Sequence, residues 1–422
     1  MEHTNRTIRP LTQQDLEAYL DIYLNAYPAY KTLDEACREH YREKHRLELR
    51  EDRQVQTVGL FEGDVLIATM KLILFSMNCF GRMQTACGLM ALEVHPLHKK
   101  QGAALEMIRY FEDYARRHGA LLTLLLPFQI SFYRRMGYGF AGKLYEYHLP
   151  TAVLPKPDGE ARRHLRLLQP EDFDRVLACH SRFAAQNHGM VEKFEEEVRA
   201  ARTDIQVRRI GYCADDGTLR GYVAYRFESA SDTNYTRNRL SLEELVYDDG
   251  VVLRALLGAL KLQEDLAQTV LLRTGEEDFH HLLEDPQDVS GNYIDYGFLQ
   301  TNVSAIGTMF KLLDPAAFVT ATAYRALPQG TLTAAFCYRD ELAHRDCRTV
   351  LRFDGGRWSA LPEEVPAEVT VTCRQGDLAS LLMASCGLEG MVRLGAVAVT
   401  GPWQQLAQLL HYGQKPWLNS DY

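Results

Sequence analysis

The sequence predicts an α+β protein made of three domains, and three observations lead to that fold class. Strand and helix patterns alternate through the first 150 residues, a similar order of patterns returns from about residue 165, and antiparallel strand patterns dominate from about residue 305. The chain has 422 residues, and a chain of that length is long enough for about three domains. We therefore expect domains over residues 1–150, 151–303 and 304–422.

The first domain is predicted to begin with a strand, a helix and a hairpin. A strand, a turn and a helix starting near Asp15 are indicated by "TIRPLTQQDLEAYLDIYLNAY", and two antiparallel strands around residues 62–64 by "TVGLFEGDVLIATMKLILFSM". A further strand is indicated by "TACGLMALEV". The later run "ALLTLLLPF" is apolar throughout, which is typical of a strand buried on both faces. A short helix, "ISFYRRMGYG", follows and stops at Gly137 and Gly139.

The second domain is predicted to repeat the first. The segment "LRLLQPEDFDRVL" from Leu165 can be laid over "IRPLTQQDLEAYL" from Ile8. A hairpin pattern follows, "IGYCADDGTLRGYVAYRF", and then a strand, a loop, a helix and an apolar strand. Common elements can align by chance, but the preserved order of four elements favours a duplication.

The third domain shows a different pattern. Antiparallel strands are predicted over "TLTAAFCYRD", "CRTVLRFDGGRWSAL" and "AEVTVTC", with Asp354-Gly355 as a hairpin turn. Asp377 is expected to cap a helix. The last elements are a strand and a helix with Pro402 near its first turn and Gly413 near its end. We expect a small α+β domain.

Composition and charge exclude several classes of protein. The chain is 46% hydrophobic and 24% charged, as in an ordinary soluble protein. Its net charge of −9 disfavours nucleic acid as a partner and favours cationic small molecules. The longest apolar run, residues 121–128, is too short to span a bilayer.

The cysteines and the start of the chain predict a cytoplasmic protein. Nine cysteines are scattered and never form a CxxC pair, which argues against a disulfide framework or a zinc site and for a reducing compartment. The start, "MEHTNRTIRP", has no apolar signal-peptide region. His95 and His98 could suggest a metal pair, but no third ligand lies at a suitable spacing, so we expect no metal.

The segment "EVHPLHKKQGAALEMIRYFEDYARRHGA", residues 93–120, contains the strongest candidate site. Apolar residues recur at three- and four-residue spacing, which predicts a helix. Lys99, Lys100 and Gly102 gather at its first turn, where a helix presents unpaired N–H groups and the positive end of its dipole. This pattern suits a pyrophosphate cradle, although it lacks the GxGxxG and P-loop spacings. The alternative is an ordinary solvated helix start.

The second copy departs from this pattern at the same place. It reads "VYDDGVVLRA", so that Asp248 and Asp249 stand where the first copy has lysines. Two carboxylates at a helix N-terminus repel a phosphate. We therefore expect the second domain to be a degenerate, structural copy.

The stretch "LEVHPLHKKQGAALEMIRYFEDYARRHGALLTLLLPFQISFYRRMGYG" resembles the GNAT acetyltransferases. In that superfamily a strand, a basic-x-x-Gly-x-Gly/Ala loop and a helix hold acetyl-CoA. Two such domains followed by a sterol-carrier-like domain resemble the Eis (enhanced intracellular survival) branch. The chain differs from the usual loop pattern of the superfamily in two respects: it has lysines where arginines are commoner, and Ala104 where a second Gly is frequent. Neither change removes a backbone N–H, but Lys lacks the bidentate fork of Arg.

The resemblance implies acetyl-CoA as co-substrate, no metal, and a set of residues around the cofactor. The backbone of residues 92–94 would pair with the pantetheine arm, and the amide of Val94 or of a close neighbour would polarise the thioester carbonyl. Residues 100–105 would hold the pyrophosphate, and residues 128–129, from the next strand, would flank the arm. The implied cofactor-binding residues are Leu92, Glu93, Val94, Lys99, Lys100, Gln101, Gly102, Ala103, Ala104, Leu105, Phe128 and Gln129.

The resemblance also implies two catalytic groups. Tyr133 would protonate the departing CoA thiolate, since a phenol with a pKa of about 10 suits a thiol with a pKa of about 8.5. Its alternative role is packing, as for Tyr138. Tyr422 would supply its terminal carboxylate as the base, although a carboxylate with a pKa of roughly 3.5 needs burial or a water relay for that task. The alternative is a frayed tail.

Two functions follow from these expectations. The first is an N-acetyltransferase that acts on primary amines; the resemblance implies aminoglycosides, polyamines or lysine-type side chains, so a small molecule or a peptide. The second is a non-catalytic acyl-CoA or lipid-binding carrier or sensor. The acceptor pocket is expected near Tyr27, Tyr30 and the C-terminal residues. The resemblance further suggests a symmetric homo-oligomer such as a hexamer.

Overall fold

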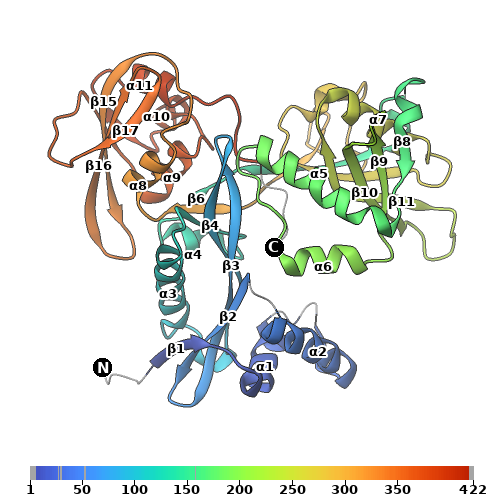
Figure 1. Ribbon diagram of the computed structural model, residues 1–422, viewed down its shortest axis with the longest axis horizontal. Helices are drawn as coiled ribbons and strands as arrows, with labels where there is room; N and C mark the ends of the chain where they lie inside the picture. The colour runs from blue at the N-terminus through green and yellow to red at the C-terminus, as the bar shows by residue number, and fades with distance from the viewer. Residues whose placement is uncertain (1–5, 27, 29–30, 52–53, 157, 418–422) are drawn as a thin grey trace.

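The computed structural model describes residues 6–26, 28, 31–51, 54–156 and 158–417 (Figure 1). These residues form two seven-stranded sheets and one five-stranded sheet, each with helices packed on it. The predicted α+β class, with two similar sheets in tandem, is therefore confirmed. No helix in the described ranges is both long and apolar enough to cross a bilayer.

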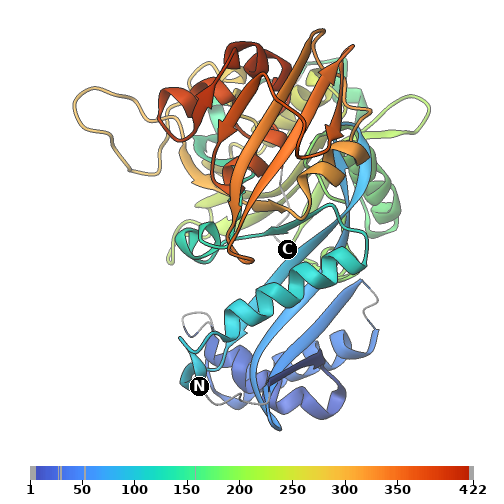
Figure 2. The same ribbon diagram turned by 90° about the vertical axis from the view of Figure 1, so that its left-hand side faces the viewer.

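The first sheet has the strand order β1-β2-β3-β4-β5-β14-β6. Its strands are β1 (Arg6–Pro10), β2 (Val55–Glu62), β3 (Val65–Cys79), β4 (Arg82–Val94), β5 (Leu122–Leu125), β14 (Met309–Leu312) and β6 (Gly139–Phe140). Helices α1 (Leu16–Ala26) and α2 (Glu35–Glu51) lie on one face, and α3 (Ala103–Arg117) lies on the other (Figure 1). Figure 2 shows α3, in cyan, lying along the long blue strands, with the third sheet, in orange, beyond its end.

The second sheet repeats this order as β13-β7-β12-β11-β10-β9-β8. Its strands are β8 (Leu165–Leu167), β9 (Arg208–Cys213), β10 (Leu219–Ser229), β11 (Asn238–Tyr247), β12 (Thr269–Thr274), β7 (Lys143–Pro150) and β13 (Val303–Ile306). Its helices are α5 (Phe173–Gln186), α6 (Glu195–Thr203) and α7 (Gly250–Lys261). Along β10 the side chains alternate: Val223 and Tyr225 pack with α7, whereas Tyr222 and Ala224 pack with α5.

The two seven-stranded sheets exchange strands across the predicted boundaries at residues 150 and 303. β7 follows six strands of the first sheet in the chain, β1 to β6, but pairs with β12 of the second sheet. β14 comes after the second sheet but pairs with β5 and β6 of the first. An uncovered strand edge leaves backbone N–H and C=O groups unpaired, and the exchange covers the edges of β5 and β12. The division into domains 1–150, 151–303 and 304–422 remains a prediction. The sheets do not keep to these boundaries, because β7 and β14 each pair with strands of another predicted domain.

The third sheet has the order β17-β16-β15-β18-β19. Its strands are β15 (Thr331–Asp340), β16 (Arg345–Asp354), β17 (Arg357–Leu361), β18 (Val369–Thr372) and β19 (Ala398–Thr400). Its helices are α8 (Pro315–Ala321), α9 (Gln375–Leu382), α10 (Leu388–Arg393) and α11 (Trp403–Leu410). Its core is continuous with that of the first sheet, because Phe75 of β3 and Leu378 of α9 belong to one buried cluster.

One expected cap in this domain is wrong. Asp377 was expected to cap α9, but the N-cap is Arg374 and Asp377 lies in the first turn. The carboxylate of Asp377 instead pairs with Nη1 of Arg134, on α4 (Ile130–Arg134), at 2.8 Å. This long-range ion pair, which local sequence does not reveal, takes the place of the cap.

Candidate functional site

The candidate site lies where β4 and β5 diverge. The two strands pair in parallel only from Ala86↔Leu122 to Leu89↔Leu125. Beyond Leu89, β4 carries an irregularity at Ala91, whose φ is 51°, and its register with β3 shifts at the same point. Such bulges bend a strand and end its pairing. The backbone of β4 after Leu89 is therefore open toward the segment that follows β5.

A cavity of about 480 Å³ fills this opening. Its walls come from the end of β4, the loop before α3, the first turn of α3 and the segment from Leu126 to Tyr133. Eleven of the twelve predicted cofactor-binding residues line it, and so does Tyr133. Gln101 is the exception, because its carbonyl oxygen accepts a hydrogen bond from Arg6 and its side chain donates to the carbonyl of Leu97. The structure thus brings the predicted residues together in one place.

The first turn of α3 presents uncapped N–H groups beside the cavity. The N-cap is Gly102, with φ 86°, and it offers no side-chain acceptor. Lys100 is also in the left-handed region, with φ 63°. A loop of this kind turns backbone N–H groups toward one point, and the helix dipole adds positive potential there. An anion is the ligand that this arrangement suits.

The corresponding turn of the second sheet is already occupied by a side chain of the protein. Asp249 is the N-cap of α7, and its carboxylate accepts hydrogen bonds from the N–H groups of Val251 and Val252 at 2.9 and 3.0 Å. Arg220 pairs with the same carboxylate at 2.7 Å. The free anion-binding groups seen at α3 are therefore absent at this turn of α7.

Two neighbouring tyrosines occupy different environments. Tyr133, on α4, lines the cavity, and its ring meets those of Phe132 and Tyr138 edge-on at 5.1 and 5.9 Å. Tyr138 is fully buried outside the cavity, and its hydroxyl accepts a hydrogen bond from Thr123 at 3.2 Å. Burial raises the pKa of Tyr138 well above its ordinary value. Of the two, Tyr133 is the one placed to reach a ligand.

Glu93 places a buried carboxyl group in the cavity wall. Its side chain is 2% exposed, Oε2 accepts a hydrogen bond from Thr69 at 3.3 Å, and Oε1 has no hydrogen-bond partner among the described residues. Burial raises the pKa of Glu93 to about 8, against the opposing charges of Lys31 and Lys71. Near neutral pH this carboxyl therefore carries its proton.

A buried ionic cluster that the sequence did not predict lies behind Glu93. Lys71 of β3 pairs with Glu48 of α2 at 2.8 Å, and His45 contacts the same carboxylate at 2.8 Å. Burial opposes ionisation of Glu48, but the hydrogen bond from His45 and the charge of Lys71 lower its pKa to about 2. The one sequence feature that indicates this cluster is Lys71, a lysine inside the apolar run "VLIATMKLILFSM".

The remaining predicted residues take other positions. The side chain of His95 accepts a hydrogen bond from the N–H of Leu97, and His98 lies 3.9 Å from Glu62. Within the ranges that the structure describes, no three His, Cys, Asp or Glu side chains gather as a metal site. Tyr422, Tyr27 and Tyr30 lie outside the described residues. The described chain ends at Trp417, whose ring packs edge-on against Phe183 at 5.6 Å.

Comparisons with known proteins point to one type of domain. Residues 7–141 match the family model of an acetyltransferase (GNAT) domain, and residues 189–299 match a second family model with the same description. No curated protein sequence matches the chain.

Solved structures share the fold over nearly the whole chain. A conserved protein of Enterococcus faecalis V583, described as a probable N-acyltransferase, is 16% identical with a TM-score of 0.79, over 99% of this chain and 100% of that one. A GCN5-related N-acetyltransferase from Kribbella flavida is 19% identical with a TM-score of 0.74, over 99% and 98%. Eis1 from Mycobacterium abscessus is 18% identical with a TM-score of 0.73, over 99% and 100%.

Proposed function

This chain is an acetyltransferase with two GNAT domains, and from that premise we propose that its first domain transfers the acetyl group of acetyl-CoA to a primary amine. The observation that carries the proposal is the single cavity in which the open end of β4, the uncapped start of α3 and Tyr133 meet. The second domain lacks that arrangement at α7. Because the chain is an acetyltransferase, we do not retain the alternative hypothesis of a non-catalytic acyl-CoA or lipid-binding carrier or sensor.

The lysines, the uncapped start of α3 and the open edge of β4 support acetyl-CoA as the ligand of this cavity. Its pyrophosphate would lie on the N–H groups of residues 103–105, with Lys99 and Lys100 adding positive charge. The pantetheine arm would run along residues 92–94 of β4, whose edge is open there, and residues 128–129 would flank it from the other side. Bound in this way, acetyl-CoA supplies an activated acyl thioester at the inner end of the cavity.

The reaction needs one proton donor and one proton acceptor. The amine nitrogen attacks the thioester carbonyl carbon, the C–S bond breaks, and the thiolate takes a proton from the hydroxyl of Tyr133. The ammonium formed on the acceptor must lose a proton, and we propose the terminal carboxylate of Tyr422 as the base. Glu93 also lines the cavity, but its raised pKa of about 8 keeps it protonated near neutral pH, so it can act as a base only above that pH.

The test of the proposal is acetyl transfer from acetyl-CoA across a panel of primary amines. We expect Tyr133→Phe to lower the turnover number by roughly 10²-fold, because a positioned general acid contributes about 10² to 10⁴, and to leave acetyl-CoA affinity unchanged. Tyr138→Phe is the matched control, since Tyr138 is buried outside the cavity, and it should keep turnover. An unchanged rate and pH profile in Tyr133→Phe would remove Tyr133 from the mechanism.

Acidic groups near the cavity suit a cationic acceptor. Behind Glu93, Glu48 and Glu196 place two carboxylates around Lys71, and the chain carries a net charge of −9. We propose aminoglycoside, polyamine or lysine-type acceptors on this ground together with the sequence resemblance. We also propose that Tyr27 and Tyr30 contact the acceptor.

Three further features of the sequence resemblance remain proposals. A sterol-carrier-like third domain is supported by the separate five-stranded sheet with its four helices. A homo-oligomer such as a hexamer is supported by exposed apolar side chains in the loop before β13, among them Tyr293, Tyr296 and Phe298. A cytoplasmic location is supported by nine cysteines without a disulfide.

A further inference from the structure

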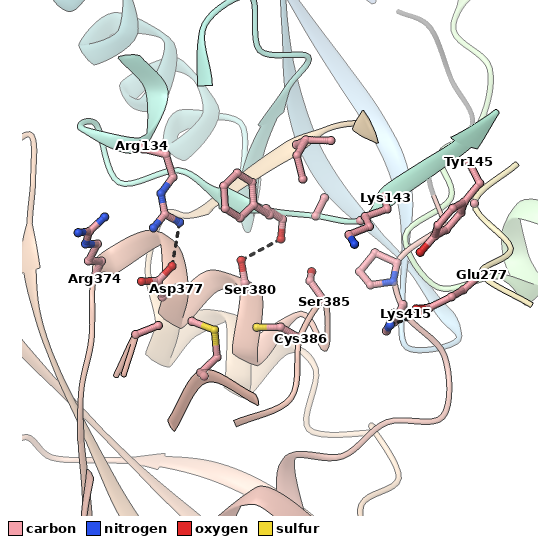
Figure 3. A pocket seen from close by; sticks show the side chains of 18 of the residues that line it. Arg134, Lys143, Tyr145, Glu277, Arg374, Asp377, Ser380, Ser385, Cys386 and Lys415 are labelled. Atoms are coloured by element: carbon pink, nitrogen blue, oxygen red, sulfur yellow. Dashed lines mark hydrogen bonds and ion pairs between the residues drawn. The ribbon is translucent and has the colours of Figure 1, made fainter. Parts of the chain in front are cut away.

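A second cavity, of about 490 Å³, lies where the three sheets meet (Figure 3). Its walls come from α4, the start of β7, the loop after β12, the turn between α9 and α10, and the segment before Trp417. It shares no lining residue with the cavity between β4 and β5. Its size falls within the usual range of small-molecule sites, about 300–1,000 Å³.

Positive charge exceeds negative charge around this cavity. Four cationic side chains line it against two carboxylates. Both carboxylates are already engaged, Asp377 with Arg134 and Glu277 with Lys415. Lys143, on β7, makes no hydrogen bond or ion pair within the described residues, although its charge also acts on Glu277. The guanidinium of Arg374 likewise has no such partner among the described residues. A local surplus of two positive charges in a chain of net charge −9 favours an anionic ligand.

A buried hydroxyl in the wall of the cavity also lacks a hydrogen-bond partner among the described residues. Oγ of Ser385 is inaccessible to solvent and makes no hydrogen bond with any described residue. Figure 3 shows Ser385 and Lys143 with their polar ends turned toward the space between the strand and the helix. A buried hydroxyl without a hydrogen-bond partner lowers the stability of the fold, and an anionic oxygen would accept a hydrogen bond from it.

Part of the cavity wall is apolar. Phe140, Ile306 and Met391 line it together with Cys386. Burial raises the pKa of the Cys386 thiol to about 11, so that this side chain adds no negative charge near neutral pH. A wholly polar anion would leave this surface uncovered, whereas an anion with a short hydrocarbon chain would bury it.

We propose that this cavity binds a small amphipathic anion, a carboxylate or a phosphate with a short alkyl chain. The anionic head lies at Nζ of Lys143 and Oγ of Ser385, and the chain lies on Phe140, Cys386 and Met391. The site is separate from the acetyl-CoA cavity and does not depend on the proposed reaction.

Isothermal titration calorimetry on the full chain tests this site directly, with octanoate and octyl phosphate as probes. We expect saturable binding of one molecule per chain for at least one probe, and the tighter of the two identifies the head group. Octyltrimethylammonium, which has the same chain with the opposite charge, should not bind. Acetate, which has the head group without the chain, should bind at least tenfold more weakly than octanoate.

Variants locate the binding. Lys143→Met should weaken the tighter probe at least tenfold, and Ser385→Ala should weaken it severalfold. The control Arg357→Met removes an exposed charge on β17, outside the cavity, and should leave the affinity unchanged. Ala396→Trp places bulk at an exposed position of the cavity wall and should abolish binding in a protein with an unchanged circular dichroism spectrum.

Several results would overturn the proposal. They are no saturable binding of either anion, equal binding of octyltrimethylammonium, or an unchanged affinity in Lys143→Met. If Lys143→Met does not fold, Ala396→Trp decides in its place, and wild-type affinity in that variant contradicts the site.

Discussion

Glu93 combines burial, a missing hydrogen bond and nearby cations in one side chain. The sequence shows a glutamate within the strand pattern "TACGLMALEV", and the family resemblance placed its backbone, not its carboxyl, at the cofactor. The groups that set its pKa, Thr69, Lys31 and Lys71, come from other elements. Sequence spacing could not bring them together, because only the folded sheet does so.

The raised pKa of Glu93 predicts a pH-dependent stability. The folded protein holds this proton up to about pH 8, whereas an exposed glutamate releases it at about 4.3. Between these values the folded state binds more protons than the unfolded state, so the free energy of unfolding should fall as pH rises. Glu93→Gln should flatten that part of the curve, measured by urea denaturation from pH 4.5 to 8.5. A slope equal to that of the wild type would show that Glu93 is ionised in the folded protein.

At the scale of elements, local patterns predicted those with clear apolar periodicity. The β2–β3 hairpin, β4, α3 and β5 all appear where expected. Helix α2 was not predicted, because "EACREHYREKHRLELRE" has few apolar residues and buries His45 and Glu48 instead. The buried carboxylate of Glu48 pairs with Lys71 of β3. The spacing of apolar residues along the chain cannot predict such a contact.

The start of α3 makes a prediction at Gly102. Its φ of 86° disfavours any side chain, although a Cβ there would meet no atom within 4 Å. Gly102→Ala should therefore lower the free energy of unfolding by roughly 1–2 kcal/mol and weaken CoA binding as the loop shifts, measured by denaturation and calorimetry. The matched control is Gly250→Ala at the start of α7, where φ is ordinary and space is open. Equal CoA affinity in Gly102→Ala and wild type would show that the loop geometry does not hold the cofactor.

The C-terminal segment carries the prediction for the proposed base. Residues up to Trp417 are anchored, with the N–H of Trp417 donating to the carbonyl of His188 at 2.7 Å. Adding residues after Tyr422 would move the terminal carboxylate without disturbing this anchor. We expect turnover to fall and acetyl-CoA affinity to persist, measured by steady-state kinetics and calorimetry. Full activity in the extended chain would exclude the terminal carboxylate from the mechanism.

At the scale of the whole molecule, strand exchange is the feature that sequence patterns could not predict. β7 and β14 look like ordinary strands of their own neighbourhoods, and only the fold shows which sheet edge each one covers. Lys311 of β14 reinforces the exchange, because its ammonium is buried and contacts Glu112 of α3 at 2.8 Å and the carbonyl of Met136 at 2.9 Å. The first domain is therefore completed by a strand from beyond residue 303.

The central claim is that the first domain, and not the second, holds acetyl-CoA between β4 and β5. A crystal structure of the full chain with CoA tests it most directly. We predict the pyrophosphate at the N–H groups of residues 103–105 and the sulfur within hydrogen-bond reach of the hydroxyl of Tyr133. CoA bound at α7, or bound with its sulfur remote from Tyr133, would contradict the account.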